Sequence, residues 1–269
     1  MSAFSADWLG LREPYDARAR NRAVLDALAA ALADRASIAV VDLACGTGAT
    51  SRAIASRLPR RQSWRLVDND PSLLARAASP APPAGTDVVT MPLDLARQLD
   101  AALAAPLDLV TASALLDLVS GAWLERLARA VAARGLMVYA ALSYDGRLAL
   151  EPADPVDAAM IEAVNRHQRG DKGFGPALGP TAAVEAVACF AGLNYAVASG
   201  TSDWRLGPAD QAIQADLVAG WATAARQLGG LAPAEIDGWL DRRRDHVARG
   251  RSSIEVGHVD VLARPIGAR

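Results

Sequence analysis

The chain has 269 residues, of which 52% are hydrophobic, enough for one large domain or for a core domain with an insertion. Its formal net charge is −2 and it has no dense block of basic residues, which argues against a nucleic-acid partner. No apolar run approaches the ~20 residues of a membrane span, and residues 1–8 lack the basic and apolar regions of a secretion signal, so we expect a cytoplasmic protein with no membrane contact.

The first expected element is a helix over residues 14–34. Apolar side chains recur there at helical spacing, as at Val24, Leu28 and Leu32, and Pro14 suits the first turn of a helix. The polar segment 12–16 before this helix is flanked by apolar residues. Two interpretations are open for it, a lid over a ligand or a simple helix cap.

Residues 40–48 are the most informative segment of the chain. An apolar strand ends at Asp42 and opens into a turn that contains Gly46 and Gly48, and a helix-like run follows at once. Glycines let backbone N–H groups approach a ligand closely, and the first turn of a helix offers unpaired N–H groups. A second apolar strand ends at Asp68, where a carboxylate can accept both hydroxyl protons of a ribose. This order of elements predicts a nucleoside pocket.

The glycine turn does not fit a dinucleotide well. The third glycine of the dinucleotide fingerprint is replaced here by Ser51. An acid at the position of Asp42 would repel a pyrophosphate, whereas it suits a ligand that bears an ammonium group. A nicotinamide-dependent oxidoreductase is therefore disfavoured.

Strands and helices alternate through the first half of the chain. We expect strands at 38–43, 63–68, 86–91, 107–112 and 135–142, and helices at 49–58, 71–78, 94–103 and 121–133. Asp70 before Pro71 is a strong helix start, and residues 79–85 are too rich in proline for regular structure. The alternation predicts an α/β fold whose mainly parallel sheet is covered by helices on both faces.

The pattern changes after residue 145. A helix at 154–168 leads into a segment, 169–180, rich in glycine and proline; a helix at 181–191 and a strand at 193–199 follow. Two amphipathic helices at 208–227 and 233–248 precede a final strand at 254–263. We interpret 205–250 as a helical cap inserted before the last strand, over the ligand crevice.

Four motifs in this order resemble those of class I S-adenosylmethionine-dependent methyltransferases. Residues 42–48 resemble the first motif and 66–70 the second, with Asp68 in the ribose-binding place. Residues 91–95 are similar to the third, where Asp94 would take the adenine amino group and Leu95 would pack on the ring. Residues 107–117 are similar to the fourth strand and the loop beneath the methyl group. The resemblance covers about residues 38–145 and implies a doubly wound, mainly parallel seven-stranded Rossmann-like sheet with an antiparallel last strand.

The resemblance implies S-adenosyl-L-methionine as cofactor. An alternative role is open for Asp42, which could cap the following turn, and for Asp94, which could cap the next helix. The expected cofactor-binding residues are Asp42, Ala44, Cys45, Gly46, Gly48, Asp68, Asn69, Asp94, Leu95 and Ser113. The expected organisation is an N-terminal helical lid (1–36), a Rossmann-like core (37–204 and 251–269) and the helical cap (205–250).

The resemblance also implies methyl transfer by in-line displacement. The absence of a basic face and the inserted cap favour a small-molecule acceptor. The loop at 111–115 lacks the Asn/Asp-Pro-Pro-Tyr signature of methyltransferases that act on amide or exocyclic amino nitrogens. Candidate general bases are Asp117 and His167, and the candidate acceptor contacts are Tyr144, Arg169, Lys172 and Trp204. For His167, Arg169 and Lys172 a solvated connector is an equal alternative.

The remaining alternatives are a non-catalytic S-adenosylmethionine-binding protein and a methyltransferase that acts on a protein or a nucleic acid. The three histidines and two cysteines have no metal-ligand spacing, so no metal is expected, and a disulfide between Cys45 and Cys189 is not expected either. The acceptor's identity and the oligomeric state are left open by the sequence.

Overall fold

A computed structural model describes residues 4–79, 84–104 and 106–267 of the chain. The helices, in chain order, are α1 (Ala6–Ala19), α2 (Arg22–Leu32), α3 (Ala49–Ile54), α4 (Pro71–Ala78), α5 (Leu95–Ala102), α6 (Gly121–Ala132), α7 (Asp157–Gln168), α8 (Ala182–Ala191), α9 (Gln211–Leu228) and α10 (Pro233–Ala248), with short 3-10 turns η1 (Ala55–Arg57) and η2 (Gly179–Thr181). The strands are β1 (Ser37–Leu43), β2 (Arg61–Asp68), β3 (Thr86–Pro92), β4 (Leu109–Ser113), β5 (Met137–Glu151), β6 (Tyr195–Thr201), β7 (Trp204–Leu206) and β8 (Ser253–Pro265).

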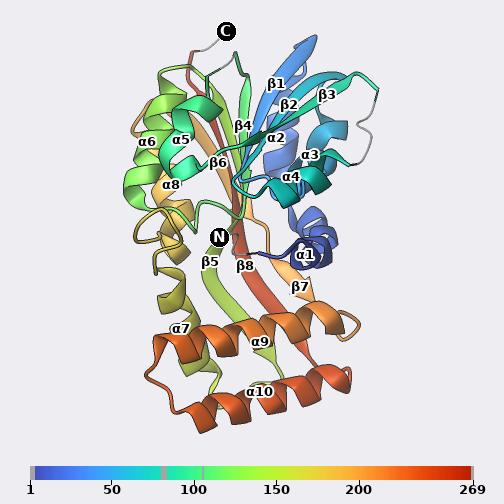
Figure 1. Ribbon diagram of the computed structural model, residues 1–269, viewed down its shortest axis with the longest axis vertical. Coiled ribbons are helices and arrows are strands. Elements are labelled where there is room, and N and C mark those ends of the chain that lie inside the picture. The colour runs from blue at the N-terminus through green and yellow to red at the C-terminus, as the bar shows by residue number, and fades with distance from the viewer. Residues whose placement is uncertain (1–3, 80–83, 105, 268–269) are drawn as a thin grey trace.

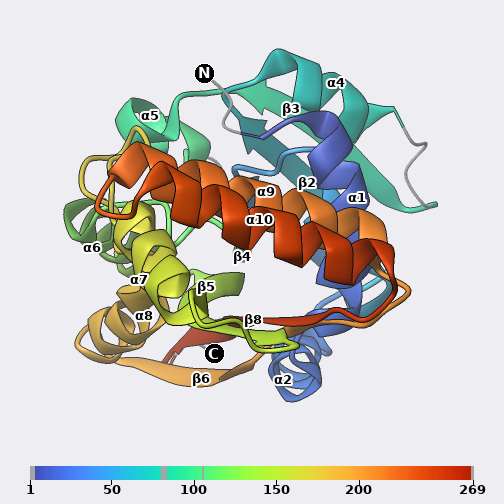
Figure 2. The same cartoon turned by 90° about the horizontal axis from the view of Figure 1, so that it is seen from below.

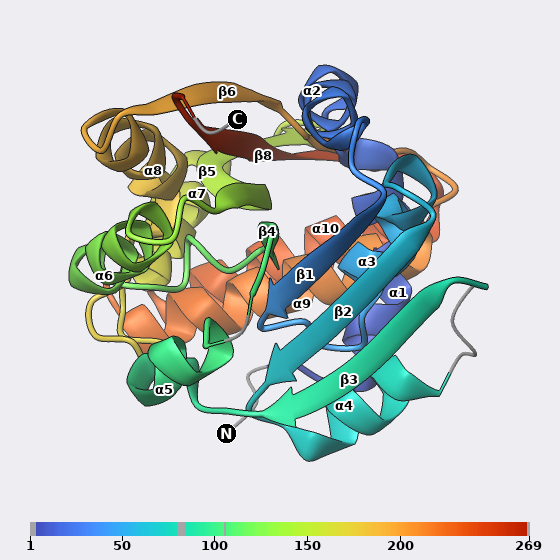
Figure 3. The same cartoon turned by 90° about the horizontal axis from the view of Figure 1, so that it is seen from above.

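The strands form one sheet in the order β3-β2-β1-β4-β5-β8-β6, and β7 pairs with β8 outside this path (Figure 3). The pairs among β1 to β5 are parallel, whereas β8 is antiparallel to β5, β6 and β7. The predicted Rossmann-like sheet with an antiparallel last strand is confirmed. The three-residue strand β7 was not predicted, because so short a segment carries no measurable period.

Both faces of the sheet are covered by helices. Val40 packs with α2, α3 and α4, whereas its neighbour Val41 packs with α5, α6 and α8 on the opposite face. Successive side chains of a strand point to opposite faces, so a strand buried on both sides reads as a continuous apolar run. Figure 1 shows these two helical layers on either side of the sheet.

The N-terminal region differs from the prediction of one helix over 14–34, which is wrong. The first helix begins at Ala6, because the hydroxyl of Ser5 accepts a hydrogen bond from the N–H of Trp8 at 3.1 Å. Pro14 therefore lies inside α1, where it costs about 3 kcal/mol. The chain turns at Arg20, and Asn21 caps the second helix.

Strands β5 and β8 extend well beyond the parallel part of the sheet. Strand β5 continues to Glu151, past its expected end at residue 142, and pairs with β8 as far as Ser253. This two-stranded extension carries α9 and α10, which lie side by side at the far end of the molecule, with α7 packed on α9 (Figures 1 and 2). A separate apolar core around Trp204 and Trp239 holds this cap together.

Candidate cofactor and acceptor site

A cavity of about 540 Å³ lies where the carboxyl ends of β1, β2 and β4 meet. The turn after β1 forms one of its walls. Ala44, Gly46 and Gly48 all adopt positive φ there, at 52°, 53° and 80°. A Cβ added at Gly46 would lie 3.0 Å from the end of the Leu9 side chain in α1, which would have to shift, so the glycine allows the turn and this helix to pack closely. The volume is in the range of small-molecule sites.

Asp68 lies at the end of β2 with its carboxylate in the cavity wall. One oxygen accepts the N–H of Gly46 at 2.8 Å, and the other accepts the N–H of Asp70 at 3.0 Å. The side chain therefore links the glycine turn to the start of α4. Because each carboxylate oxygen has two acceptor positions, Asp68 can also accept the hydroxyl protons of a ribose.

Asp94 caps a helix and also lies in the cavity wall, so its position is compatible with both of the roles that the sequence left open. Its carboxylate caps α5 by accepting the N–H of Ala96 at 3.0 Å, and it also lines the cavity beside Asn69 and Leu95. The carbonyl of Leu95 accepts the indole N–H of Trp123 at 2.8 Å, which fixes this segment against α6. Apolar side chains of Leu73 and Leu93 complete a slot suited to a flat base.

Asp42 and Gly48, two of the expected cofactor-binding residues, do not line the cavity, which corrects the expectation that they belong to its wall. Asp42 is completely buried beneath the turn, where one carboxylate oxygen accepts the hydroxyl of Thr111 at 2.7 Å. Burial raises the pKa of Asp42 to about 7, against the opposing effects of the Thr111 hydrogen bond and the Arg20 charge. Gly48 supplies the left-handed backbone that begins α3. Both residues support the turn from below.

Helix α1 forms the roof of the cavity. Leu9, Arg12 and Asp16 recur at helical spacing and line it. Arg12 and Asp16 form a buried ion pair with Nε–Oδ2 and Nη2–Oδ1 distances of 2.9 and 3.2 Å. The adjoining face of the helix, with Trp8 and Tyr15, packs into the core of the cap. Helix α1 is therefore held between the cavity and the cap.

Trp204 anchors this roof and does not face an acceptor, a second correction. Its indole N–H donates to Asp16 at 3.0 Å, and the Arg12 guanidinium lies 5.0 Å from its ring centre. Only 3% of the Trp204 surface is exposed. Within the described residues, no side chain of α9 or α10 lines the cavity. The cap thus acts on the site through α1 and not as a direct cover.

The cavity is also lined by Ser113 at the end of β4, by Leu115 and Leu118 after it, and by Lys172 and Phe174. We name this part of the wall the acceptor end, because the resemblance places the loop after the fourth strand beneath the methyl group. Ser113 accepts a hydrogen bond from the buried Arg20 guanidinium at 3.3 Å. This end is mostly apolar, with the cationic side chain of Lys172 at its edge.

Lys172 is the one expected acceptor contact that lies in the cavity wall. Its Nζ donates to the carbonyl of His167 at 3.2 Å and lies 3.5 Å from His167 Nδ1. In the described part of the chain no carboxylate pairs with it, and partial burial lowers its pKa. His167 does not line the cavity, because its other ring nitrogen contacts Gln227 of α9 at 2.9 Å. It holds Lys172 in place.

Asp117, Tyr144 and Arg169 also lie outside the cavity wall. Asp117 is buried and directly precedes the cavity residue Leu118 in the chain; burial raises its pKa to about 6, although a backbone hydrogen bond and the charge of Arg12 oppose the shift. One of its oxygens, Oδ1, has no hydrogen-bond partner in the described structure. The Tyr144 hydroxyl contacts Asn165 Oδ1 at 2.7 Å, and Arg169 is exposed.

Several residues of the cavity wall were not predicted from the sequence, including Leu9, Asp16, Thr50, Leu73 and Phe174. The spacing of Arg12 and Asp16 by four residues was a usable signal, because it predicts a pair on one face of a helix. Among the described residues, no group of three or more His, Cys, Asp or Glu could hold a metal ion, and no helix is both long and apolar enough to cross a bilayer.

Comparison with known proteins decides which cofactor the cavity takes. Residues 40–135, which contain the glycine turn, Asp68 and Asp94, match a family described as "Methyltransferase domain". This chain carries a class I S-adenosylmethionine-dependent methyltransferase domain. No curated protein matches the sequence significantly.

The fold of this methyltransferase is similar to that of solved structures. Cyclopropane synthase MmaA2 from Mycobacterium tuberculosis has a TM-score of 0.52 at 11% identity, with 97% of this chain and 95% of that chain covered. A proposed type II methyltransferase from Anaeromyxobacter dehalogenans has a TM-score of 0.52 at 16% identity, covering 92% and 97%. At these identities the likeness shows the fold alone.

The cavity fits S-adenosylmethionine. Asp68 would hold the ribose, Asn69, Asp94 and Leu95 the adenine, and the turn at Ala44–Thr47 the methionine part. The acids Asp68 and Asp94 lie at the adenosine end, whereas the cations Arg12 and Lys172 lie elsewhere in the wall.

Proposed function

We propose that this methyltransferase transfers the methyl group of S-adenosylmethionine to a small molecule that carries an electron-rich or anionic group. The supporting observation is the composition of the acceptor end. Leu115, Leu118 and Phe174 offer an apolar surface there, and Lys172 adds a cation without an acidic partner among the described residues. An unpaired, partly buried cation favours a negatively charged group on the ligand.

The shape of the cavity also favours a small acceptor. Helix α1 covers it from one side, and the segment Lys172–Phe174 closes it from another. The whole cavity, of about 540 Å³, must hold the cofactor and the acceptor together. A folded protein surface or a duplex would need a more open approach.

S-adenosylmethionine supplies the methyl carbon, which leaves the sulfur with the C–S bond electrons remaining on sulfur and forms a new bond to the acceptor oxygen, nitrogen or carbon. The chain's own residues orient the two partners in line and exclude water. The turn and Asp68 fix one partner, and Lys172, held by His167, fixes the other. Direct transfer between the two bound partners requires no covalent bond to a protein side chain.

An acceptor that carries a proton must lose it to a base. Asp117 is the best placed carboxylate, because it is buried, directly precedes Leu118 of the acceptor end in the chain and has a free oxygen. Its pKa of about 6 leaves it mostly ionised near neutral pH and basic enough to accept a proton. We propose Asp117 as the proton acceptor, reached through a water or by movement of Leu118.

The decisive experiment incubates the enzyme with S-adenosylmethionine labelled in the methyl group and a size-fractionated cell extract. Label that accumulates in the small-molecule fraction, and falls at least tenfold in Lys172→Met, supports the proposal. Label confined to protein or nucleic acid would refute the small-molecule acceptor. Arg169→Met is the matched control, because Arg169 is an exposed cation on the same segment outside the cavity.

The role of Asp117 is tested separately by the pH dependence of kcat. With Asp117 as base, kcat rises with pH through about 6 and then levels, and Asp117→Asn loses this step. An unchanged pH profile in the variant would remove the residue from the mechanism. Cofactor affinity in the variant, measured in parallel, separates a lost base from a damaged fold.

A further inference from the structure

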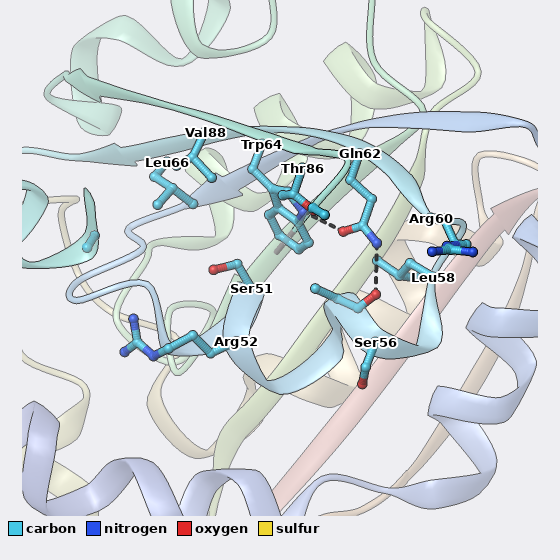
Figure 4. Close-up of a pocket in the computed structure, with 13 residues that line it drawn as sticks. Ser51, Arg52, Ser56, Leu58, Arg60, Gln62, Trp64, Leu66, Thr86 and Val88 are labelled. Atoms are coloured by element: carbon cyan, nitrogen blue, oxygen red, sulfur yellow. Dashed lines mark hydrogen bonds between the residues drawn. The ribbon is translucent and has the colours of Figure 1, made fainter. Parts of the chain in front are cut away.

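A second cavity, of about 460 Å³, lies between α3–η1 and the face of strands β2 and β3 (Figure 4). It shares no lining residue with the cofactor cavity. Ala77 of α4 (Pro71–Ala78) and Ala84 also belong to its lining. The cavity is large enough for an organic molecule of drug size.

The floor of this second cavity is apolar and has its polar atoms paired. Trp64, Leu66 and Val88 come from the two strands, and Leu58 and Ala77 close the sides. The indole N–H of Trp64 donates to Gln62 Oε1 at 2.7 Å. The Gln62 amide N–H₂ donates to the carbonyls of Ala55 and Pro59, both at 2.8 Å. An apolar part of a ligand can therefore cover this floor without leaving the polar atoms of Trp64 and Gln62 without hydrogen-bond partners.

The rim of the cavity is positively charged. Its lining contains Arg52 and Arg60 and no acid among the described residues, and Figure 4 shows the two arginines at opposite ends. Arg52 is already engaged, since it donates to both carboxylate oxygens of Glu13 and to the carbonyl of Thr47. Arg60 has no carboxylate partner among the described residues. One cation thus remains to be paired by a ligand.

We propose that this cavity binds a small molecule with an apolar ring or chain and a single carboxylate. The apolar body lies on Trp64, Leu66 and Val88, and the carboxylate pairs with Arg60. Burial of the body supplies most of the affinity, whereas the partly exposed ion pair selects an acid over its neutral analogue.

The second cavity is linked to the cofactor turn through α3. Arg52 lies in its wall and connects Glu13 of the α1 roof with the Thr47 carbonyl, at 2.7 and 2.6 Å. Ser51, also in the wall, donates to the Gly48 carbonyl at 2.9 Å. A ligand that contacts these side chains changes cofactor affinity, and bound cofactor changes ligand affinity by the same factor.

The test uses naphthoate and its neutral amide, naphthamide, titrated against the full chain by ligand-observed NMR. We expect naphthoate to bind saturably with a Kd of about 1 mM or tighter, and naphthamide to bind about fivefold more weakly. Arg60→Gln should remove this difference. Arg61→Gln is the matched control, an exposed neighbouring arginine outside the lining, and should preserve it.

Location and linkage are tested with two further measurements. Thr86→Trp places a large ring in the cavity and should abolish naphthoate binding. Saturating S-adenosylhomocysteine should shift the naphthoate Kd without displacing the ligand. Absence of binding, complete displacement by S-adenosylhomocysteine, or an unchanged acid preference in Arg60→Gln would each overturn the proposal. The proposed acceptor chemistry is unaffected by these outcomes, because it concerns the other cavity.

Discussion

Replacing Asp68 with Asn tests whether the Asp68 carboxylate binds the ribose of the cofactor. In the folded protein both oxygens of Asp68 accept backbone N–H groups, at 2.8 Å from Gly46 and 3.0 Å from Asp70. The amide keeps one acceptor and turns the other into a donor that faces an N–H. The charge that would strengthen the two ribose hydrogen bonds is lost at the same time.

The expected loss of cofactor affinity is about 1.5–3 kcal/mol, the size of one hydrogen bond to a charged group, or roughly ten- to 150-fold in Kd. Isothermal titration with S-adenosylhomocysteine measures it. The misplaced donor also destabilises the turn by about 1–3 kcal/mol, so unfolding in urea must be followed in parallel.

Asp70→Asn is the control, because Asn caps a helix as well as Asp does and Asp70 does not line the cavity. We expect this variant to change the Kd by less than about twofold. Equal affinity of Asp68→Asn and the parent protein would place the ribose elsewhere. An equal loss in both variants would assign the effect to the start of α4 and not to the carboxylate.

Three further predictions concern other parts of the site. Arg52→Ala should weaken S-adenosylhomocysteine binding by about 0.2–1 kcal/mol, as should Glu13→Gln, and the double variant should lose no more than either single one if the pair acts as a unit. Burial raises the pKa of Asp117 above its ordinary 3.8 to about 6, so native stability falls as pH rises through that range. Asp117→Asn should therefore exceed the parent protein in urea unfolding by up to about 3 kcal/mol near pH 8 and match it near pH 4; a pH-independent difference would contradict this assignment. Ala114 has a φ of 50°, so Ala114→Gly should raise the free energy of unfolding by about 0.5–1 kcal/mol, whereas Ala112→Gly on the same strand should lower it; loss of stability in both would show that Ala114 is not strained.

The parts of the site that could be predicted from the sequence are those whose structure depends on short, continuous segments of the chain. The glycine turn, Asp68 and the Asp70–Pro71 helix start depend on neighbours within a few residues, so their roles follow from local sequence. Eight of the ten expected cofactor residues line the cavity. Asp42 is an exception because its exposure depends on how the turn folds back over the strand end, which no local pattern specifies.

Helix α1, which forms the roof of the cavity, was not predictable in the same way, because it is stabilised by contacts with residues that are distant in the sequence. The interval 14–34 has the stronger helical period, yet α1 begins at Ala6 and includes Pro14. Trp8 and Tyr15 gain enough from burial against the cap to offset the proline. The partner of Asp16, Trp204, lies 188 residues away. Sequence periodicity indicates the local secondary-structure preference of a segment. It does not indicate stabilisation by a residue that is distant in the sequence.

These long-range contacts indicate how the cap contributes to the site without touching the cofactor. Near the start of α1, Trp8 packs into the cap core, and in its last turn Asp16 accepts a hydrogen bond from the indole N–H of Trp204. Directly after the helix, the buried Arg20 donates to Ser113 at the end of β4 and to the Tyr139 hydroxyl, both at 3.3 Å. The roof is thus fixed to the cap and to the sheet at the same time. Because packed interfaces resist continuous deformation, we expect a change in cap packing to shift α1 as a unit, together with the residues by which it lines the cavity.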